Sequence, residues 1–277
     1  MKIVAACVAA AVAASAAACA AVASSGGPSP APARSRSGSA ATARSAAPRA
    51  QPSTAPLPLA GKVIVLDPGH NGGNASHPEI INQLVNVISE QKGCDTVGAE
   101  TAAGYPEHAF NFDVAIRLAA LLRREGARVT LTRHDDNGVG PCVTERAAIG
   151  NRAHADAAIS IHADGGPPGG TGFEIIEPGL IPGHTNKIID PSHRLALDLR
   201  SAYHAGTGEP YSDYIGNQGL DVRTDLGGLN LSTVPKVFIE CGNMRNSSDA
   251  GRLTSPGFRQ RIAGSLAAGF TMFLTGH

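Results

Sequence analysis

Short, continuous apolar runs alternate with helical patterns along most of this chain, and this alternation constrains its fold most strongly. The first run, residues 63–66, ends at an Asp-Pro-Gly turn. From Glu107, apolar residues recur at helical spacing until Gly126 ends the pattern. Apolar strands separated by helices indicate a single α/β domain with a mostly parallel sheet flanked by helices on both faces. The expected strands are residues 63–66, 129–131, 157–161, 173–176 and 234–239, and the expected helices are residues 107–125, 144–154, 193–204 and 258–273.

The first 60 residues differ in composition from the rest. Lys2 is followed by an alanine-rich apolar run that ends in a small-x-small site, which predicts a secretory signal peptide over residues 1–23. Two alternatives are an uncleaved membrane anchor and a lipid attached at Cys19. Residues 24–60 are rich in Ser, Ala, Pro and Arg, which predicts a disordered linker. Residues 61–277 are then the folded domain.

The charge of the 277-residue chain is balanced, with 23 basic and 23 acidic side chains. Because residues 1–60 hold five basic side chains and no acidic one, the folded part is weakly acidic. This balance argues against a nucleic-acid partner. The absence of Trp excludes a sugar-binding groove of stacked indoles. With the predicted signal peptide, we expect a secreted protein without a stable membrane span after cleavage.

Five cysteines are present, and Cys94 and Cys142 are the natural disulfide pair. Both lie in loops that contain glycine, and an oxidising compartment favours their pairing. Closing this loop would stabilise the fold by roughly 4 kcal/mol in the chain-entropy model. Cys241 follows an apolar strand and is expected to be a buried thiol. No Cys-x-x-Cys spacing occurs, so a cysteine zinc site is not expected.

Polar side chains follow several of the expected strands. His70 and His162 each come at the end of a strand, Glu107 opens a helix, and Glu240 ends the last strand. Ligands of such sheets bind beyond the carboxyl ends of the strands. Imidazole and carboxylate are usual zinc ligands, and catalytic zinc keeps three protein ligands with one open position. The pattern therefore favours a zinc site with a second carboxylate beside it.

Each of these residues also has a local explanation. A histidine after a strand can be a hydrogen-bonded loop residue, and Glu107 can complement the positive end of its helix. Glu240 can form an ion pair with Arg245. Four such groups at one end of a sheet favour the site over four separate structural roles.

Six motifs in the same order and spacing carry a family resemblance, and together they cover residue 61 to the C-terminus. The chain resembles the zinc-dependent N-acetylmuramoyl-L-alanine amidases, and its signal peptide and cysteine pair are most similar to secreted, single-domain mycobacterial peptidoglycan amidases. It departs from the pattern with Asn71 directly after His70 and with Cys241 after Glu240. The motifs are residues 63–70 (VIVLDPGH), 106–111 (PEHAFN), 132–133 (TR), 149–153 (IGNRA), 159–164 (ISIHAD) and 237–243 (VFIECGN).

The resemblance implies one Zn²⁺ held by His70, Glu107 and His162, with Glu240 as the catalytic carboxylate. It also implies that residues 61–277 are the catalytic domain of a monomer located in the periplasm or cell wall. The implied substrate is peptidoglycan or its muropeptide fragments, and the implied bond is the amide between N-acetylmuramic acid and L-alanine. Asp67 is expected either to accept from a ligand histidine or to cap its own turn. Two other functions remain open: a catalytically silent peptidoglycan-binding regulator and a zinc peptidase of stem peptides.

The loop of residues 71–104 is expected to form one wall of the substrate groove. Residues 80–88 within it have an apolar pattern that is compatible with a helix. The disulfide would stiffen this wall and take no part in the chemistry. His108 is expected to point away from the site because its neighbour Glu107 points toward it.

Overall fold

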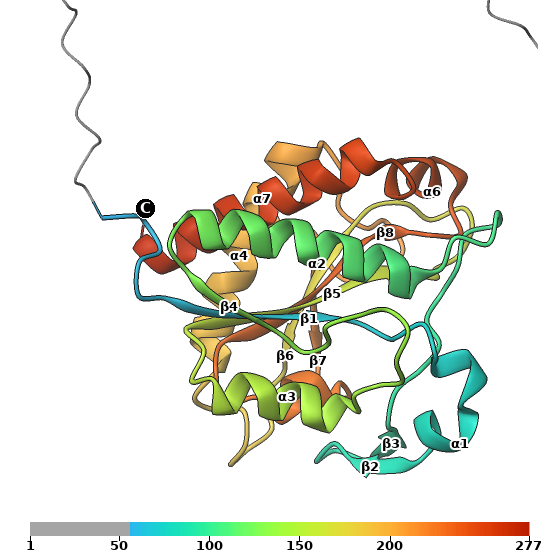
Figure 1. Cartoon of the computed structure of the whole chain (residues 1–277), viewed down its shortest axis with the longest axis horizontal. Coiled ribbons are helices and arrows are strands. Elements are labelled where there is room, and N and C mark those ends of the chain that lie inside the picture. Colours follow the sequence, from blue (N-terminus) through green and yellow to red (C-terminus); the bar gives the residue numbers. More distant parts are fainter. Residues whose placement is uncertain (1–55, 277) are drawn as a thin grey trace, which may run out of the picture. The chain divides into compact units, whose positions relative to one another are not determined.

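A six-stranded sheet in the order β4-β1-β5-β8-β6-β7 forms the centre of the fold (Figure 1). The computed structural model describes residues 56–276. Strands β4, β1, β5 and β8 are parallel, whereas β6 runs antiparallel to β8 and parallel to β7. The mostly parallel sheet predicted from the apolar runs is confirmed. The strands are β1 (Val63–Pro68), β4 (Arg128–Leu131), β5 (Ala157–Asp164), β6 (Glu174–Pro178), β7 (Leu220–Arg223) and β8 (Lys236–Asn243).

Helices cover both faces of this sheet. Three long helices, α2 (Glu107–Arg124), α4 (Ile189–Thr207) and α7 (Pro256–Thr275), pack together on one face, and α3 (Val143–Arg152) and α5 (Gly227–Asn230) lie on the other (Figure 1). The remaining helices are the short 3-10 turn η1 (Asn74–Ser76), α1 (Pro78–Ile81) and α6 (Ser247–Leu253). None of the helices in residues 56–276 is long and apolar enough to cross a membrane.

The main core lies between the sheet and the three long helices. Helix α2 contributes Phe110, Val114 and Leu118, all fully buried, at the spacing seen in the sequence. Burial of each such side chain stabilises the fold by about 1.5–3 kcal/mol. Leu59 is also fully buried in this core, and its amide donates to the carbonyl of Glu125 at 2.9 Å. The predicted linker boundary at residue 60 is therefore a few residues too late.

The predicted signal peptide, residues 1–23, lies outside the described residues, and so does the predicted linker up to residue 55.

The expectation of a helix over residues 80–88 is wrong. Helix α1 ends at Ile81, and a small antiparallel hairpin follows, formed by β2 (Leu84–Asn86) and β3 (Gln91–Gly93). Leu84 and Val85 lie on the extended strand β2, and 70% of the Leu84 side chain is exposed. The apolar residues of this segment therefore do not form one buried helical face, which a helix would need for its stability.

Candidate active site

Three side chains from different elements converge at the carboxyl edge of the sheet. His70 follows β1, Glu107 is the first residue of α2, and His162 lies on β5. Glu107 Oε1 lies 3.1 Å from His70 Nε2 and 2.9 Å from His162 Nδ1. Their potential ligand atoms all lie within 4.8 Å of one another. Two imidazoles and one carboxylate in this arrangement match the donor set of a zinc site.

The carboxylate of Glu107 is held by two backbone amides, one from the loop before α2 and one from β5. Ala99 N donates to Oε2 at 2.7 Å, and Ala163 N donates to Oε1 at 3.2 Å. Burial alone would raise the pKa of Glu107, but the neighbouring imidazoles of His70 and His162 hold this pKa well below its ordinary value. Glu107 is therefore ionised, and its side chain does more than complement the end of a helix.

Two glycines allow this close packing. A Cβ atom on Gly69 would lie 2.0 Å from the ring of His162, so no other residue fits there without moving the ring. Gly98 has a φ of 87°, and a Cβ there would lie 2.7 Å from His70 Cδ2. His70 itself has a φ of 57°, in the left-handed region that non-glycine residues rarely occupy. The sequence places a glycine before His70, but it gives no sign that Gly98 reaches the site.

The partner that orients His70 was missed in the sequence. His70 Nδ1 lies 3.0 Å from the carbonyl oxygen of Thr96, and Asp95 Oδ1 lies 3.5 Å from the same nitrogen. Because a carbonyl oxygen only accepts, Nδ1 donates to Thr96, and Nε2 is the ring nitrogen that faces Glu107 and the proposed metal position. This is the arrangement that metal-binding histidines need.

Asp67 contacts neither histidine, and its carboxylate accepts from side chains outside its own turn. Both predicted roles for it are therefore wrong. Its carboxylate accepts from Ser160 Oγ at 2.5 Å, Thr132 Oγ1 at 2.7 Å, Arg146 Nη1 at 3.0 Å and Lys236 Nζ at 3.0 Å. Burial would raise the pKa of Asp67, but the two cations hold it well below its ordinary value. Asp67 lies on β1, before the strand has ended, and there it forms ion pairs with two buried cations, Arg146 and Lys236.

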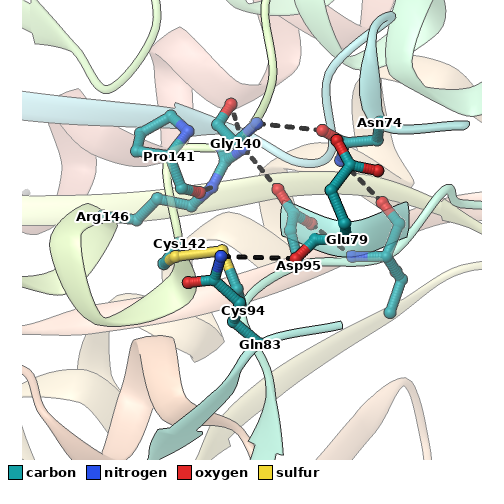
Figure 2. Close-up of a disulfide and its surroundings, with 10 residues drawn as sticks. Asn74, Glu79, Gln83, Cys94, Asp95, Gly140, Pro141, Cys142 and Arg146 are labelled. Carbon is teal, nitrogen blue, oxygen red and sulfur yellow. Dashed lines mark hydrogen bonds and ion pairs between the residues drawn. A yellow bond between two sulfur atoms is a disulfide. The ribbon is translucent and has the colours of Figure 1, made fainter. Parts of the chain in front are cut away.

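Arg146 on α3 is a second residue whose importance the sequence did not reveal. Besides Asp67, its guanidinium donates to the carbonyl of His70 at 2.9 Å and to Asp95 Oδ2 at 2.9 Å. It therefore ties the loop after β1 to the segment that orients His70. The guanidinium also donates to the carbonyl of Gly140 at 3.1 Å, beside the disulfide (Figure 2).

The disulfide expected between Cys94 and Cys142 is present, with Cα atoms 4.4 Å apart (Figure 2). It joins the end of the hairpin segment to the start of α3, and the amide of Val143 donates to the carbonyl of Cys94 at 2.8 Å. Asp95 follows directly, so the bond fixes the segment that reaches His70. Cys241 is a buried free thiol, as expected.

Asn71, the departure after His70, has a structural role in the same wall. Its Nδ2 donates to the carbonyl of Gly140 at 2.9 Å, and its Oδ1 accepts from the amide of Gly72 at 2.9 Å. Asn71 thus fixes the loop that follows the first histidine. His108 points away from the site, as expected, and its Nδ1 lies 2.8 Å from Asp136 Oδ2.

Glu240 lies on β8 directly beside His162 in the parallel register of β5 and β8. The ion pair with Arg245 that the sequence left open is not formed, and Oε2 of Glu240 is buried without a hydrogen-bond partner among residues 56–276. Burial raises the pKa of Glu240 well above its ordinary value, and the carboxylates of Glu107 and Glu174 raise it further. The carboxyl group can therefore hold a proton close to the three ligand-type side chains.

A cavity of about 390 Å³ opens in front of these groups. Its walls include both histidines, Glu107 and Glu240 at one end, and it extends over Phe238, whose ring stacks on His162 with centroids 5.2 Å apart. A ligand-type His-Glu-His group with a separate carboxylate, at the strand ends of an α/β sheet, defines a candidate metal-dependent hydrolase.

Comparison with known proteins agrees with this class. Residues 64–272 match the family model described as N-acetylmuramoyl-L-alanine amidase. This chain belongs to that family.

Several relatives are similar over most of their length. The chain is 40% identical to the N-acetylmuramoyl-L-alanine amidase Rv3717 of Mycobacterium tuberculosis over 225 residues, which is 80% of this chain and 90% of the relative. The crystal structure of the amidase Ami1 of Mycobacterium smegmatis superimposes with a TM-score of 0.74 at 40% identity, over 79% of this chain and 99% of Ami1. The amidase Ami1 of Mycobacterium abscessus gives a TM-score of 0.73 at 41% identity, over 78% and 99% of the two chains.

Proposed function

We propose that this chain hydrolyses the amide between N-acetylmuramic acid and L-alanine, in peptidoglycan or its soluble fragments. Family membership over residues 64–272 supports the reaction. The observation that carries the proposal is the convergence of His70, Glu107 and His162 beside Glu240. A silent binding protein would have no need for this complete set of groups.

We assign one zinc ion to His70, Glu107 and His162. The donor set fits, because the Thr96 carbonyl engages His70 Nδ1, Nε2 faces Glu107 at 3.1 Å, and Glu107 is ionised. A zinc ion held there acts as a Lewis acid on the scissile carbonyl and lowers the pKa of water. The protein's contribution is to fix the ligands: the Thr96 carbonyl orients His70, and the amide of Ala99 holds Glu107.

Glu240 acts as the general base and then as the general acid. Its carboxylate takes a proton from the attacking water while the water oxygen bonds to the scissile carbonyl carbon. When the carbon–nitrogen bond breaks, the same carboxyl group passes this proton to the nitrogen, which leaves as the amine of L-alanine. The raised pKa of Glu240, which burial and the neighbouring carboxylates cause, suits a group that first accepts a proton and then returns it.

We further propose that the enzyme acts outside the cytoplasm, in the periplasm or cell wall. The apolar leader of residues 1–23 supports export, and residues 24 to about 56 would connect it to the catalytic domain. The disulfide supports the same location, because such bonds persist in oxidising compartments.

Substitution of the general base tests the mechanism. Glu240→Gln should bind one zinc ion per chain while kcat falls by about 10²–10⁴-fold. His162→Ala should lose the zinc itself. Glu177→Gln is the control, because Glu177 is also a buried glutamate of the sheet but pairs with His193. Normal turnover by Glu240→Gln would remove Glu240 from the mechanism.

A further inference from the structure

The disulfide between Cys94 and Cys142 lies at the base of the segment that orients His70. Thr96 is two residues after Cys94, and its carbonyl oxygen lies 3.0 Å from His70 Nδ1. Asp95, which lies between them in the chain, approaches the same nitrogen at 3.5 Å. A displacement of Cys94 would therefore move the groups that hold the imidazole ring.

The other half of the disulfide is linked to the same groups through the loop that follows β1. Gly140 is two residues before Cys142, and its amide donates to Asn74 Oδ1 at 2.9 Å (Figure 2). Asn74 Nδ2 in turn donates to the carbonyl of Thr96 at 2.8 Å. Both cysteines are thus connected, within two residues of the bond, to the carbonyl that orients His70.

The segment around Cys94 has few other links to the central sheet. The short elements next to it, η1, α1, β2 and β3, make their main contacts with one another, and none of them is a strand of that sheet. Cys142, in contrast, directly precedes α3, which packs against β1. The amide of Val143 donates to the carbonyl of Cys94 at 2.8 Å, and Arg146 donates to Asp95 at 2.9 Å. Regions held by few buried contacts open locally while the rest of a domain stays folded.

We propose that this disulfide is a redox switch for the zinc site, so that the oxidised protein binds zinc tightly and the reduced protein binds it weakly. The inference rests on the proposed function, because it concerns the assigned ligand His70. Two thiols need more room than the bond they replace, so reduction moves Cys94 away from Cys142 and shifts the Thr96 carbonyl. Reduced chains in the cytoplasm would then hold little zinc, and oxidation after export would complete the site.

The exposure of the two sulfur atoms indicates how the bond is reduced. Cys94 is only 1% exposed, whereas Cys142 is partly exposed, so a dithiol reductant attacks the sulfur of Cys142. Its thiolate forms a mixed disulfide with Cys142 and displaces the sulfur of Cys94. Its second thiol then releases Cys142. The protein gains two electrons and two protons as two thiols, and the reductant becomes a disulfide.

The zinc affinity of the oxidised and the reduced protein tests the switch. The reductant is a phosphine, because dithiols themselves bind zinc. Competition with a chelator should give a Kd for zinc about 10–100-fold higher after reduction, the usual effect of losing a group that orients a ligand histidine. Hydrogen exchange should become faster in residues 94–96 and stay unchanged in β5.

Two variants assign the effect to this bond. The double variant Cys94→Ala/Cys142→Ala should bind zinc weakly both with and without the phosphine, which also controls for any effect of the phosphine on zinc. Cys241→Ala is the matched control, because Cys241 is a free thiol outside the disulfide. It should lose zinc affinity on reduction as the wild-type protein does.

The outcomes separate the switch from the proposed function. If the oxidised protein binds no zinc or cleaves no muropeptide when loaded with zinc, the proposed function fails. If the oxidised protein binds zinc and the reduced protein binds it within twofold of that affinity, the switch alone is refuted. Loss of the cooperative melting transition on reduction would refute the switch too, because the bond would then hold the whole domain.

Discussion

Asp67→Asn is the substitution that separates a structural role of Asp67 from a role at the metal. Asparagine has nearly the same shape, so the change removes the negative charge without leaving a cavity. Arg146 and Lys236 then keep their positive charges in the interior, where their side chains are each only 4% exposed. Lys236 loses its one carboxylate partner, whereas Arg146 keeps Asp95.

The structure sets the size of this effect. Removing one partner from a buried ion pair costs about 3–5 kcal/mol, because the other charge remains unpaired. For a domain of this size about 1 kcal/mol lowers Tm by roughly 2–4 °C, so Tm should fall by about 6–20 °C. Urea unfolding at neutral pH measures the free energy directly. Glu145→Gln is the control, because Glu145 pairs with Arg152 at the surface, with side chains 49% and 62% exposed, where an ion pair contributes under about 1 kcal/mol.

Measuring the zinc affinity of the same variant tests the alternative, a role of Asp67 at the metal. A residue that orients a ligand histidine typically contributes about 10–100-fold to metal affinity. Since Asp67 contacts neither histidine, the folded Asp67→Asn protein should bind zinc within a few-fold of the wild-type affinity. A loss of stability below about 1 kcal/mol, combined with a tenfold or larger loss of zinc affinity, would refute this reasoning.

Three further predictions follow from individual contacts. Gly69→Ala should weaken zinc binding by about tenfold or more in a chelator competition, because the added Cβ would meet the ring of His162. Gly169→Ala is the control and should have no effect, because a Cβ at that position would meet no other atom. Burial raises the pKa of Glu174 to about 8, so the folded protein keeps a proton that the unfolded chain loses above pH 4.5. The contribution of Glu174 to the free energy of unfolding should therefore fall as the pH rises from 4.5 to 8. Glu174→Gln should flatten this pH dependence of the free energy of unfolding, measured by denaturant titration. A chain that starts at residue 24 should show one free thiol, Cys241, before reduction and three after it, and three before reduction would disprove the disulfide.

The sheet and the positions of the ligand-type residues could be predicted from the sequence for one reason. Continuous apolar runs mark strands that are buried on both faces, and the residues that follow such strands gather at one edge of the sheet. His70 and His162 both follow such runs, and β1 and β5 are neighbours in the sheet. The position of Glu107 followed from the start of its helix.

The contacts of the polar core could not be predicted, because they join residues that are far apart in the chain. Asp67 meets Arg146 after 79 residues and Lys236 after 169. Thr96, which orients His70, lies in a loop without a regular pattern, and its contact uses a backbone carbonyl. No side-chain type marks such a contact. The hairpin after α1 was missed because its short strands are exposed and carry no alternating pattern.

Analysis of the reaction products tests most directly whether this chain cleaves the bond between muramic acid and L-alanine. Purified peptidoglycan fragments are digested with the zinc-loaded protein and analysed by mass spectrometry. We predict a stem peptide with a free N-terminal L-alanine together with intact N-acetylmuramic acid, and no such products from Glu240→Gln. Cleavage within the stem peptide, or the absence of any cleavage by the wild-type protein, would contradict it.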